Sequence, residues 1–123
     1  MNRVIMVSIV DDDVAVAEAT KALLRSHGYA AAAFGSAEHF LASGLVLETS
    51  CLILDIRMPG MSGPELQKLL IADGHNIPTI FMTALPEESV HREIMTAEVH
   101  GFLPKPFPEQ HLLTCVEAAL HAA

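Results

Sequence analysis

CLILDIRMPGMSG, at residues 51–63, is the stretch that decides the fold of this chain. Residues 51–54 are all apolar and leave no polar face to turn toward water, which is typical of a fully buried strand in a parallel sheet. Pro59 lacks a backbone donor, and Gly60 and Gly63 favour turns, so a loop follows the strand. Asp55 is therefore expected at the carboxyl end of a central strand, the edge at which open α/β sheets bind their ligands.

Strands and helices alternate along the rest of the chain. Apolar and β-branched runs predict further strands at residues 4–10, 29–34, 77–82 and 101–104. Helices are expected over residues 13–27, 36–44, 62–73 and 86–97, and from Pro108 onward. This order predicts an α/β fold of (βα)5 topology: a flavodoxin-like, doubly wound, five-stranded parallel sheet with strand order 2-1-3-4-5.

The ends and faces of the helices follow from local sequence signals. Ser62 and Glu65 form a capping box that opens the third helix, which is expected to bury Leu66, Leu69 and Leu70. The fourth expected helix has only a thin apolar stripe around Ile94. A thin stripe favours a helix that is held loosely, or one whose exposed face has another use.

Length, charge and cysteine content set further bounds. A chain of 123 residues is expected to form one domain, 1–123, with no output domain after it. Seven basic against fifteen acidic residues give a net charge of −8, which argues against direct contact with nucleic acid. No apolar run approaches the roughly 20 residues of a membrane span. Cys51 and Cys115 lack metal-site spacing and are expected as buried small hydrophobic residues of a cytoplasmic protein.

Polar side chains follow four of the predicted strands at the points where these strands end. Asp11 and Asp12 follow the first strand, Asp55 ends the third, Thr83 the fourth, and Lys105 follows the fifth. In a 2-1-3-4-5 sheet, strands one, three, four and five are consecutive neighbours. We therefore expect these five side chains to converge on one shallow site.

The chemistry of this set points to phosphoryl transfer. Clustered carboxylates repel one another unless a cation joins them, and oxygen ligands without histidine or cysteine fit Mg²⁺. Lys105 and Thr83 add an ammonium and a hydroxyl, which a transferring phosphoryl group needs around its outer oxygens. Asp55 would then be the nucleophile and form an aspartyl phosphate.

Each residue alone has a simpler explanation. An acid such as Asp13 most often caps a helix, and that role is favoured here over direct metal contact. Thr83 alone would satisfy a turn, and Lys105 alone would be solvated. An acid that ends a buried run, as Asp55 does, is harder to explain structurally. The joint placement at four strand ends favours the functional interpretation of the set.

At this point the sequence resembles a known family over essentially its whole length: the receiver domains of two-component response regulators. The resemblance is carried by IVDDD at 9–13, LDIRMPGMSG at 54–63, Thr83 with Ala84, and FLPKPF at 102–107. SAEHFL at 36–41, together with Arg57, is most similar to the FixJ-like branch. Members of that branch often carry a LuxR-type DNA-binding output domain and regulate transcription.

The resemblance implies a mechanism and a metal site. Asp55 would accept a phosphoryl group from a sensor histidine kinase or a small phosphodonor. Asp12 and Asp55 would bind Mg²⁺ directly, the Arg57 carbonyl would be a third ligand, and Asp11 would act mainly through water. The domain would catalyse only its own phosphorylation and dephosphorylation, and would not otherwise be an enzyme.

The resemblance also implies a switch. Thr83 and Lys105 would contact the phosphoryl oxygens, Phe102 occupies the aromatic switch position, and Lys105-Pro106 matches the usual cis peptide. Phosphorylation would change the face made by the fourth helix, the last strand and the fifth helix, where a homodimer would form. The chain departs from the branch at residues 97–99, AEV, where a glycine is usual.

Three rival functions stay open at this stage. An aspartate-nucleophile phosphohydrolase needs a second acid two residues after the nucleophile, and that position is Arg57. A pseudo-receiver that is never phosphorylated would not need the full set of acids, threonine and lysine. A flavin- or nucleotide-binding module ranks last, because the chain has no GxGxxG motif.

Overall fold

A computed structural model describes residues 5–84 and 101–122 of the chain. Within these ranges there are five strands, β1 (Met6–Val10), β2 (Ala30–Phe34), β3 (Cys51–Asp55), β4 (Thr79–Thr83) and β5 (Gly101–Pro104). The helices of the same ranges are α1 (Val14–Ser26), α2 (Ala37–Ala42), α3 (Gly63–Ala72) and α5 (Glu109–Ala122). The helix expected over residues 86–97 lies outside the described residues.

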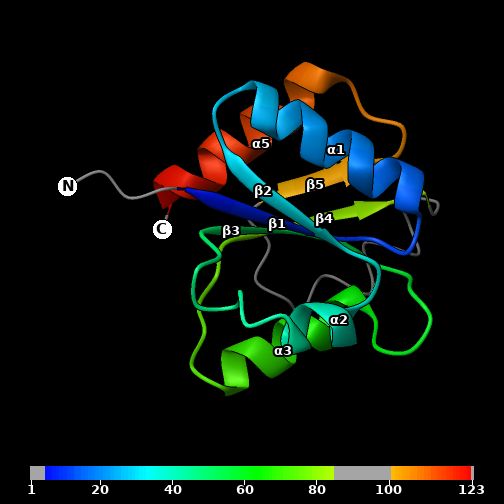
Figure 1. The fold of residues 1–123 in the computed structure, drawn as a ribbon, viewed down its shortest axis with the longest axis vertical. Coiled ribbons are helices and arrows are strands. Elements are labelled where there is room, and N and C mark those ends of the chain that lie inside the picture. The colour runs from blue at the N-terminus through cyan, green and yellow to red at the C-terminus, as the bar shows by residue number, and fades with distance from the viewer. Residues whose placement is uncertain (1–4, 85–100, 123) are drawn as a thin grey trace.

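The five strands form one parallel sheet in the order β2-β1-β3-β4-β5, which confirms the predicted topology. Helices α1 and α5 cover one face of this sheet, and α2 and α3 cover the other (Figure 1). The register pairs Ile9 with Ile53 and Asp55 with Met82, so β3 runs through the centre of the sheet. The carboxyl ends of β1, β3, β4 and β5 therefore meet along one edge.

Strand β3 is buried on both faces, as its apolar sequence predicts. Cys51 and Ile53 belong to the core cluster under α1 and α5, while Leu52 and Leu54 belong to the cluster under α2 and α3. All four side chains are fully buried. Burying an apolar side chain of this size stabilises the fold by roughly 1.5–3 kcal/mol, so β3 anchors both layers of helices.

Two expectations about the elements are wrong. The fourth strand begins at Thr79 rather than Ile77, because Pro78 has no N–H to give to a sheet ladder. On α3, Leu69 is exposed, and Gln67 is buried together with Leu66 and Leu70. Residues 63, 66, 67 and 70 follow the i, i+3, i+4, i+7 spacing of one helix face, and Leu69 lies off that face.

The predicted helix caps are present. Asp13 is the N-cap of α1, and its Oδ1 accepts a hydrogen bond from Val16 N at 3.2 Å. Ser62 Oγ accepts from Glu65 N at 3.2 Å, and Glu65 Oε1 accepts from Ser62 N at 3.0 Å, which completes the capping box of α3. The Lys105-Pro106 peptide is cis, as the resemblance implied. No helix among residues 5–84 and 101–122 is long and apolar enough to cross a membrane.

Gly63 lets α3 begin directly against the end of β3. Its N–H donates to the carbonyl oxygen of Ile56 at 3.1 Å, which closes the loop of residues 56–62. A Cβ atom at this position would run into the carbonyl oxygen of Asp55. The absence of a side chain at Gly63 thus fixes how closely the loop folds back on the strand that carries Asp55.

Gly63→Ala is therefore expected to lower the free energy of unfolding by about 1–3 kcal/mol, the usual cost of forcing an atom into a packed site. Urea denaturation measures the change. Gly35→Ala is the matched control, because no atom lies within 4 Å of a Cβ there. Equal stabilities of the two variants would contradict the steric argument.

Candidate functional site

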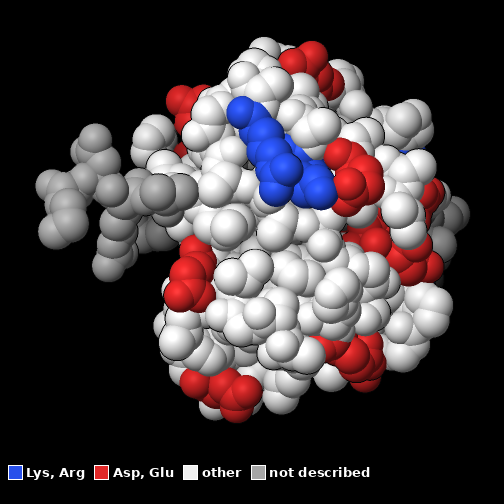
Figure 2. Space-filling view, in the orientation of Figure 1, with Lys and Arg blue, Asp and Glu red and all other residues white. Residues whose placement is uncertain are grey.

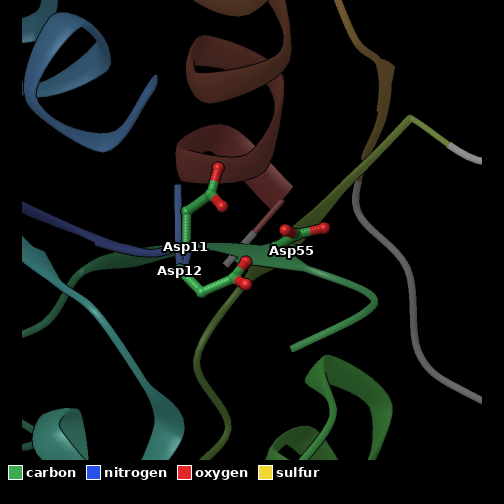
Figure 3. Close-up of side chains that lie close together, drawn as sticks. All are labelled: Asp11, Asp12 and Asp55. Carbon is green, nitrogen blue, oxygen red and sulfur yellow. The ribbon is translucent and has the colours of Figure 1, made fainter. Parts of the chain in front are cut away.

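Three acids gather at the carboxyl edge of the sheet, as predicted. One carboxylate oxygen from each of Asp11, Asp12 and Asp55 lies within 4.8 Å of the other two. Figure 3 shows Asp11 and Asp12 together after β1, with Asp55 across from them at the end of β3. Asp11 and Asp55 are buried, whereas Asp12 is exposed. The turn after β1 is held by Asp11 itself, since its Oδ1 accepts from Asp13 N at 2.9 Å.

Lys105 bridges the two buried acids. Its Nζ lies 2.8 Å from Asp11 Oδ2 and 3.2 Å from Asp55 Oδ2. Burial alone would lower the pKa of Lys105, but its bond to Asp11 and the charges of Asp55 and Asp11 outweigh burial, so the pKa is raised. The ammonium therefore stays charged and compensates part of the negative charge of the cluster.

Asp55 is the acid whose titration the fold changes. Burial, followed by the hydrogen bond to Asp11 and the charge of Asp11, raises the pKa of Asp55 to about 7. Lys105 opposes this rise through its charge and its hydrogen bond. One ammonium is therefore not enough to offset the desolvation of two neighbouring carboxylates, and the site favours additional positive charge.

The remaining predicted residues lie on the two strands β4 and β5 and in the loop that follows Asp55. Thr83 is buried at the end of β4, and its carbonyl oxygen accepts from Lys105 N at 2.7 Å. Phe102 on β5 pairs with Phe81 and is partly buried against the core cluster under α2 and α3. Arg57 is exposed, two residues beyond Asp55. The sheet thus brings Thr83 and Lys105 together. Phe102 lies on β5 two residues before Pro104, the residue that pairs with Thr83.

The residues fit a hard divalent cation. The three clustered carboxylates offer oxygen ligands, and Asp12 is open to solvent, so an ion can keep part of its water shell. Burial, together with the neighbouring Asp11, raises the pKa of Asp55, and a bound cation would lower it. Asp11, Asp12 and Asp55 are thus suited to hold Mg²⁺.

An apolar pocket of about 550 Å³ lies beside this centre. It is formed by α1 and the connection from β5 to α5, and Lys105 is part of its wall. Val16 and Leu23 line it from α1, and Pro106 and Phe107 from the other side. The site therefore has a polar centre with an apolar surface next to it.

The basic residues of α1 are engaged within the chain. Figure 2 shows one cluster of lysine and arginine over α1, the helix that carries Lys21 and Arg25, with acidic residues spread around it. Lys21 pairs with Glu18 at 2.9 Å, and Arg25 donates twice to the carbonyl oxygen of Ala31 on the edge strand β2. Arg25 thereby covers part of an open sheet edge, which discourages pairing with another strand.

The cysteines are structural. Cys51 is fully buried, as predicted, while Cys115 is only partly buried. Burial and the neighbouring Cys115 raise the pKa of the Cys51 thiol to about 12, and burial raises the pKa of Cys115 as well. Neither thiol is poised as a nucleophile.

Fold and site together define a receiver of the two-component type, and comparison with known proteins shows the family. The family model described as the response regulator receiver domain matches residues 7–117, so this chain belongs to that family. The match covers all of the clustered acids and every described strand except Met6, the first residue of β1.

Relatives within the family confirm the FixJ-like branch. Response regulator protein TmoT of Ectopseudomonas mendocina is 41% identical over 118 residues, which are 96% of this chain and 54% of TmoT. Transcriptional regulatory protein FixJ of Azorhizobium caulinodans is 40% identical over 114 residues, 93% of this chain and 54% of FixJ. The chain spans about half the length of these curated relatives. The crystal structure of FixJ-N superposes with a TM-score of 0.86 at 33% identity, covering 97% of this chain and 95% of that chain.

Two contacts of the site were not foreseen from the sequence. The bond from Lys105 to Asp11 joins residues 94 positions apart, and no local pattern marks it. The bond from Asp13 N to Asp11 Oδ1 is an Asx-type turn, which the run of three aspartates at residues 11–13 could have indicated.

Asp55→Asn is expected to stabilise the metal-free fold more at pH 8 than at pH 5. The folded-state pKa of about 7 lies above the usual value of 3.8, so the folded protein holds the proton of Asp55 more tightly than the unfolded chain does. The contribution of this carboxyl to stability therefore falls as the pH rises from about 4 to about 7. Asparagine cannot ionise, and its advantage should grow between pH 5 and pH 8 by about 2–3 kcal/mol, because about two pKa units of the shift fall between these two values.

Urea denaturation in EDTA at the two pH values measures this difference. Asp73→Asn makes the same chemical change on an exposed residue away from the cluster and serves as the control. If the advantage of Asp55→Asn is equal at both pH values, or larger at pH 5, the charge of Asp55 does not destabilise the folded protein.

Proposed function

We propose that this domain is a phospho-accepting signalling receiver in which Asp55 is the phosphorylation site. The observation that carries the proposal is the position of Asp55: a buried carboxylate at the end of the central strand, 3.2 Å from the Lys105 ammonium and within 4.8 Å of Asp11 and Asp12. Its membership of the receiver family supports the same chemistry.

In the proposed reaction, a carboxylate oxygen of Asp55 attacks the phosphorus of a phosphohistidine or of a small phosphodonor. The new P–O bond forms as the bond from phosphorus to the donor breaks, and the donor leaves with the electron pair. Lys105 is close enough to Asp55 for its ammonium to pair with a negatively charged oxygen of the transferred phosphoryl group. The Thr83 hydroxyl would donate to another phosphoryl oxygen.

Mg²⁺ is proposed as the cofactor. Asp11, Asp12 and Asp55 would hold it together with the main-chain carbonyl of Arg57, with Asp11 acting mainly through water. The bound ion would neutralise the acids and take up charge on the phosphoryl oxygens.

The proposed partner is a sensor histidine kinase. A protein donor must bring its phosphohistidine to Asp55, and the apolar pocket beside Lys105 offers such a donor a surface to pack against. In a longer protein of the FixJ type, this domain would control an output domain and thereby transcription. Residues 1–123 are proposed to belong to one receiver domain, located in the cytoplasm.

Two of the three rival functions are less compatible with the site than this proposal. A pure interaction module has no need for two buried acids around a lysine, which together cost stability. A phosphohydrolase needs an acid two residues after the nucleophile, and that position is Arg57, which is not an acid. The domain is therefore proposed to catalyse its own phosphorylation and dephosphorylation alone.

Intact-mass spectrometry after treatment with acetyl phosphate and Mg²⁺ tests the assignment. Wild-type protein is expected to gain one phosphoryl group, labile to hydroxylamine as an acyl phosphate is. Asp55→Asn should gain none, and Asp12→Asn or an excess of EDTA should slow labelling at least tenfold. Full labelling of Asp55→Asn would refute the assignment, and full labelling in EDTA would refute the role of the metal.

The proposed output is a packing switch. The Thr83 hydroxyl would move toward the phosphoryl group and vacate space, which the partly buried Phe102 could fill from the neighbouring strand β5. Such an exchange has two discrete states, as a switch requires. It would change the surface of β5 and α5, and a homodimer would form there.

Analytical ultracentrifugation with and without a beryllofluoride mimic of the phosphoryl group tests this output. We expect a monomer without the mimic and a dimer with it. The double variant Phe102→Ala with Thr83→Ala should stay monomeric in both conditions. A wild-type monomer at high concentration with the mimic would contradict the dimer, and a dimer of the double variant would contradict the coupling.

A further inference from the structure

Glu38 reaches from α2 to the loop that follows Asp55. Its Oε2 accepts a hydrogen bond from Met61 N at 3.2 Å, a contact between residues 23 positions apart. The helix α2 is held in place by Ala37 and Phe40, both fully buried in the cluster under α2 and α3. The carboxylate of Glu38 thus connects a fixed part of the core to the loop of residues 56–62.

The loop is shaped to receive this carboxylate. Gly60 adopts a φ of 79°, a conformation that a side chain disfavours. A Cβ atom on Gly60 would lie 2.9 Å from Glu38 Oε2, so the carboxylate rests directly against the glycine backbone. A hydrogen bond from a backbone N–H to an ionised carboxylate is stronger than one between neutral groups.

Backbone bonds fix the ends of the loop, the side chain of Met58 anchors it to the core, and Glu38 adds a bond near its middle. At the start, Ile56 N donates to Met82 O at 3.0 Å, and at the end Gly63 N donates to Ile56 O at 3.1 Å. Between these ends, Met58 is buried, whereas Pro59 and Gly60 are exposed. The bond from Met61 to Glu38 therefore sets the path of the exposed part of the loop.

We infer that Glu38 is a positioning residue for the Asp55 site, acting by holding the loop of residues 56–62 in the conformation that completes the cation site. The inference rests on the proposed function, because this loop carries the Arg57 carbonyl. Without the bond, the loop samples other paths, and the site forms in only a fraction of molecules. A bound cation then has to order the loop, so its apparent affinity falls by that fraction.

Three variants test the inference alongside the wild type. Glu38→Ala removes the acceptor, and Glu38→Gln keeps an acceptor oxygen while removing the charge. Glu48→Ala deletes an exposed acid elsewhere and is the control for a loss of charge alone. The first readout is hydrogen exchange of the Met61 amide in metal-free protein, and the second is the Mg²⁺ concentration that half-saturates labelling by acetyl phosphate.

Glu38→Ala is expected to speed exchange at Met61 about fivefold and to raise the half-saturating Mg²⁺ concentration by a similar factor, the effect of a hydrogen bond of roughly 1 kcal/mol. The labelling rate at saturating Mg²⁺ should stay near that of the wild type, because the bound ion orders the loop. Glu38→Gln should restore both readouts, and Glu48→Ala should leave both unchanged.

Several outcomes would overturn the inference. Unchanged Met61 exchange in Glu38→Ala would mean that the bond does not order the loop, and an unchanged Mg²⁺ dependence would mean that the order does not reach the site. Equal shifts in Glu38→Gln or Glu48→Ala would assign the effect to charge. Failure of the proposed function is distinguishable, because the wild type itself would then not be labelled, while the exchange experiment would still report on the bond.

Discussion

The structure depends on one interaction, the contact of the Lys105 ammonium with two buried carboxylates. Lys105 lies 2.8 Å from Asp11 and 3.2 Å from Asp55, and it joins the ends of β5, β1 and β3. Removing two acids from water costs several kcal/mol per group unless opposite charge and hydrogen bonds replace the solvent. The single ammonium of Lys105 offsets part of this desolvation cost. The fold tolerates the remainder because β3, buried on both faces, secures the end at which Asp55 stands.

The loop after Asp55 is subject to a second constraint, the closeness of α3 to β3. Gly63 places the first turn of α3 against the Asp55 carbonyl, so the loop has to leave the strand and return within a few residues. A short path of this kind needs glycine where φ is positive, and Gly60 supplies it. The two glycines, the capping box of α3 and the bond to Glu38 therefore act on one segment, and that segment borders the acids.

Most of the fold could be predicted from the sequence, because its signals are local. The apolar run of β3, the capping box at Ser62 and the glycine-marked turns each depend on neighbouring residues, and alternation of elements then dictates a parallel sheet. The convergence of acids on one edge followed from the strand order. Leu66, Leu69 and Leu70 also follow helical spacing, so spacing alone does not show that Leu69 is exposed; the close approach of Gly63 to β3 turns α3 so that Gln67 is buried instead. The bonds from Lys105 to Asp11 and from Glu38 to Met61 join distant residues, and only the assembled fold brings these together.

The arrangement of charge at this edge also bears on the switch proposed above. Asp55, with its pKa raised to about 7, is held in an environment that disfavours its charged form, and Lys105 offsets this only in part. Added positive charge relieves the same repulsion. Lys105 would then be free to follow a new negative group, and its main-chain bond to the Thr83 carbonyl ties that movement to the end of β4. In the proposed switch, relief of this repulsion would favour a change in the packing of β4 and β5, the two strands that carry Thr83 and Phe102.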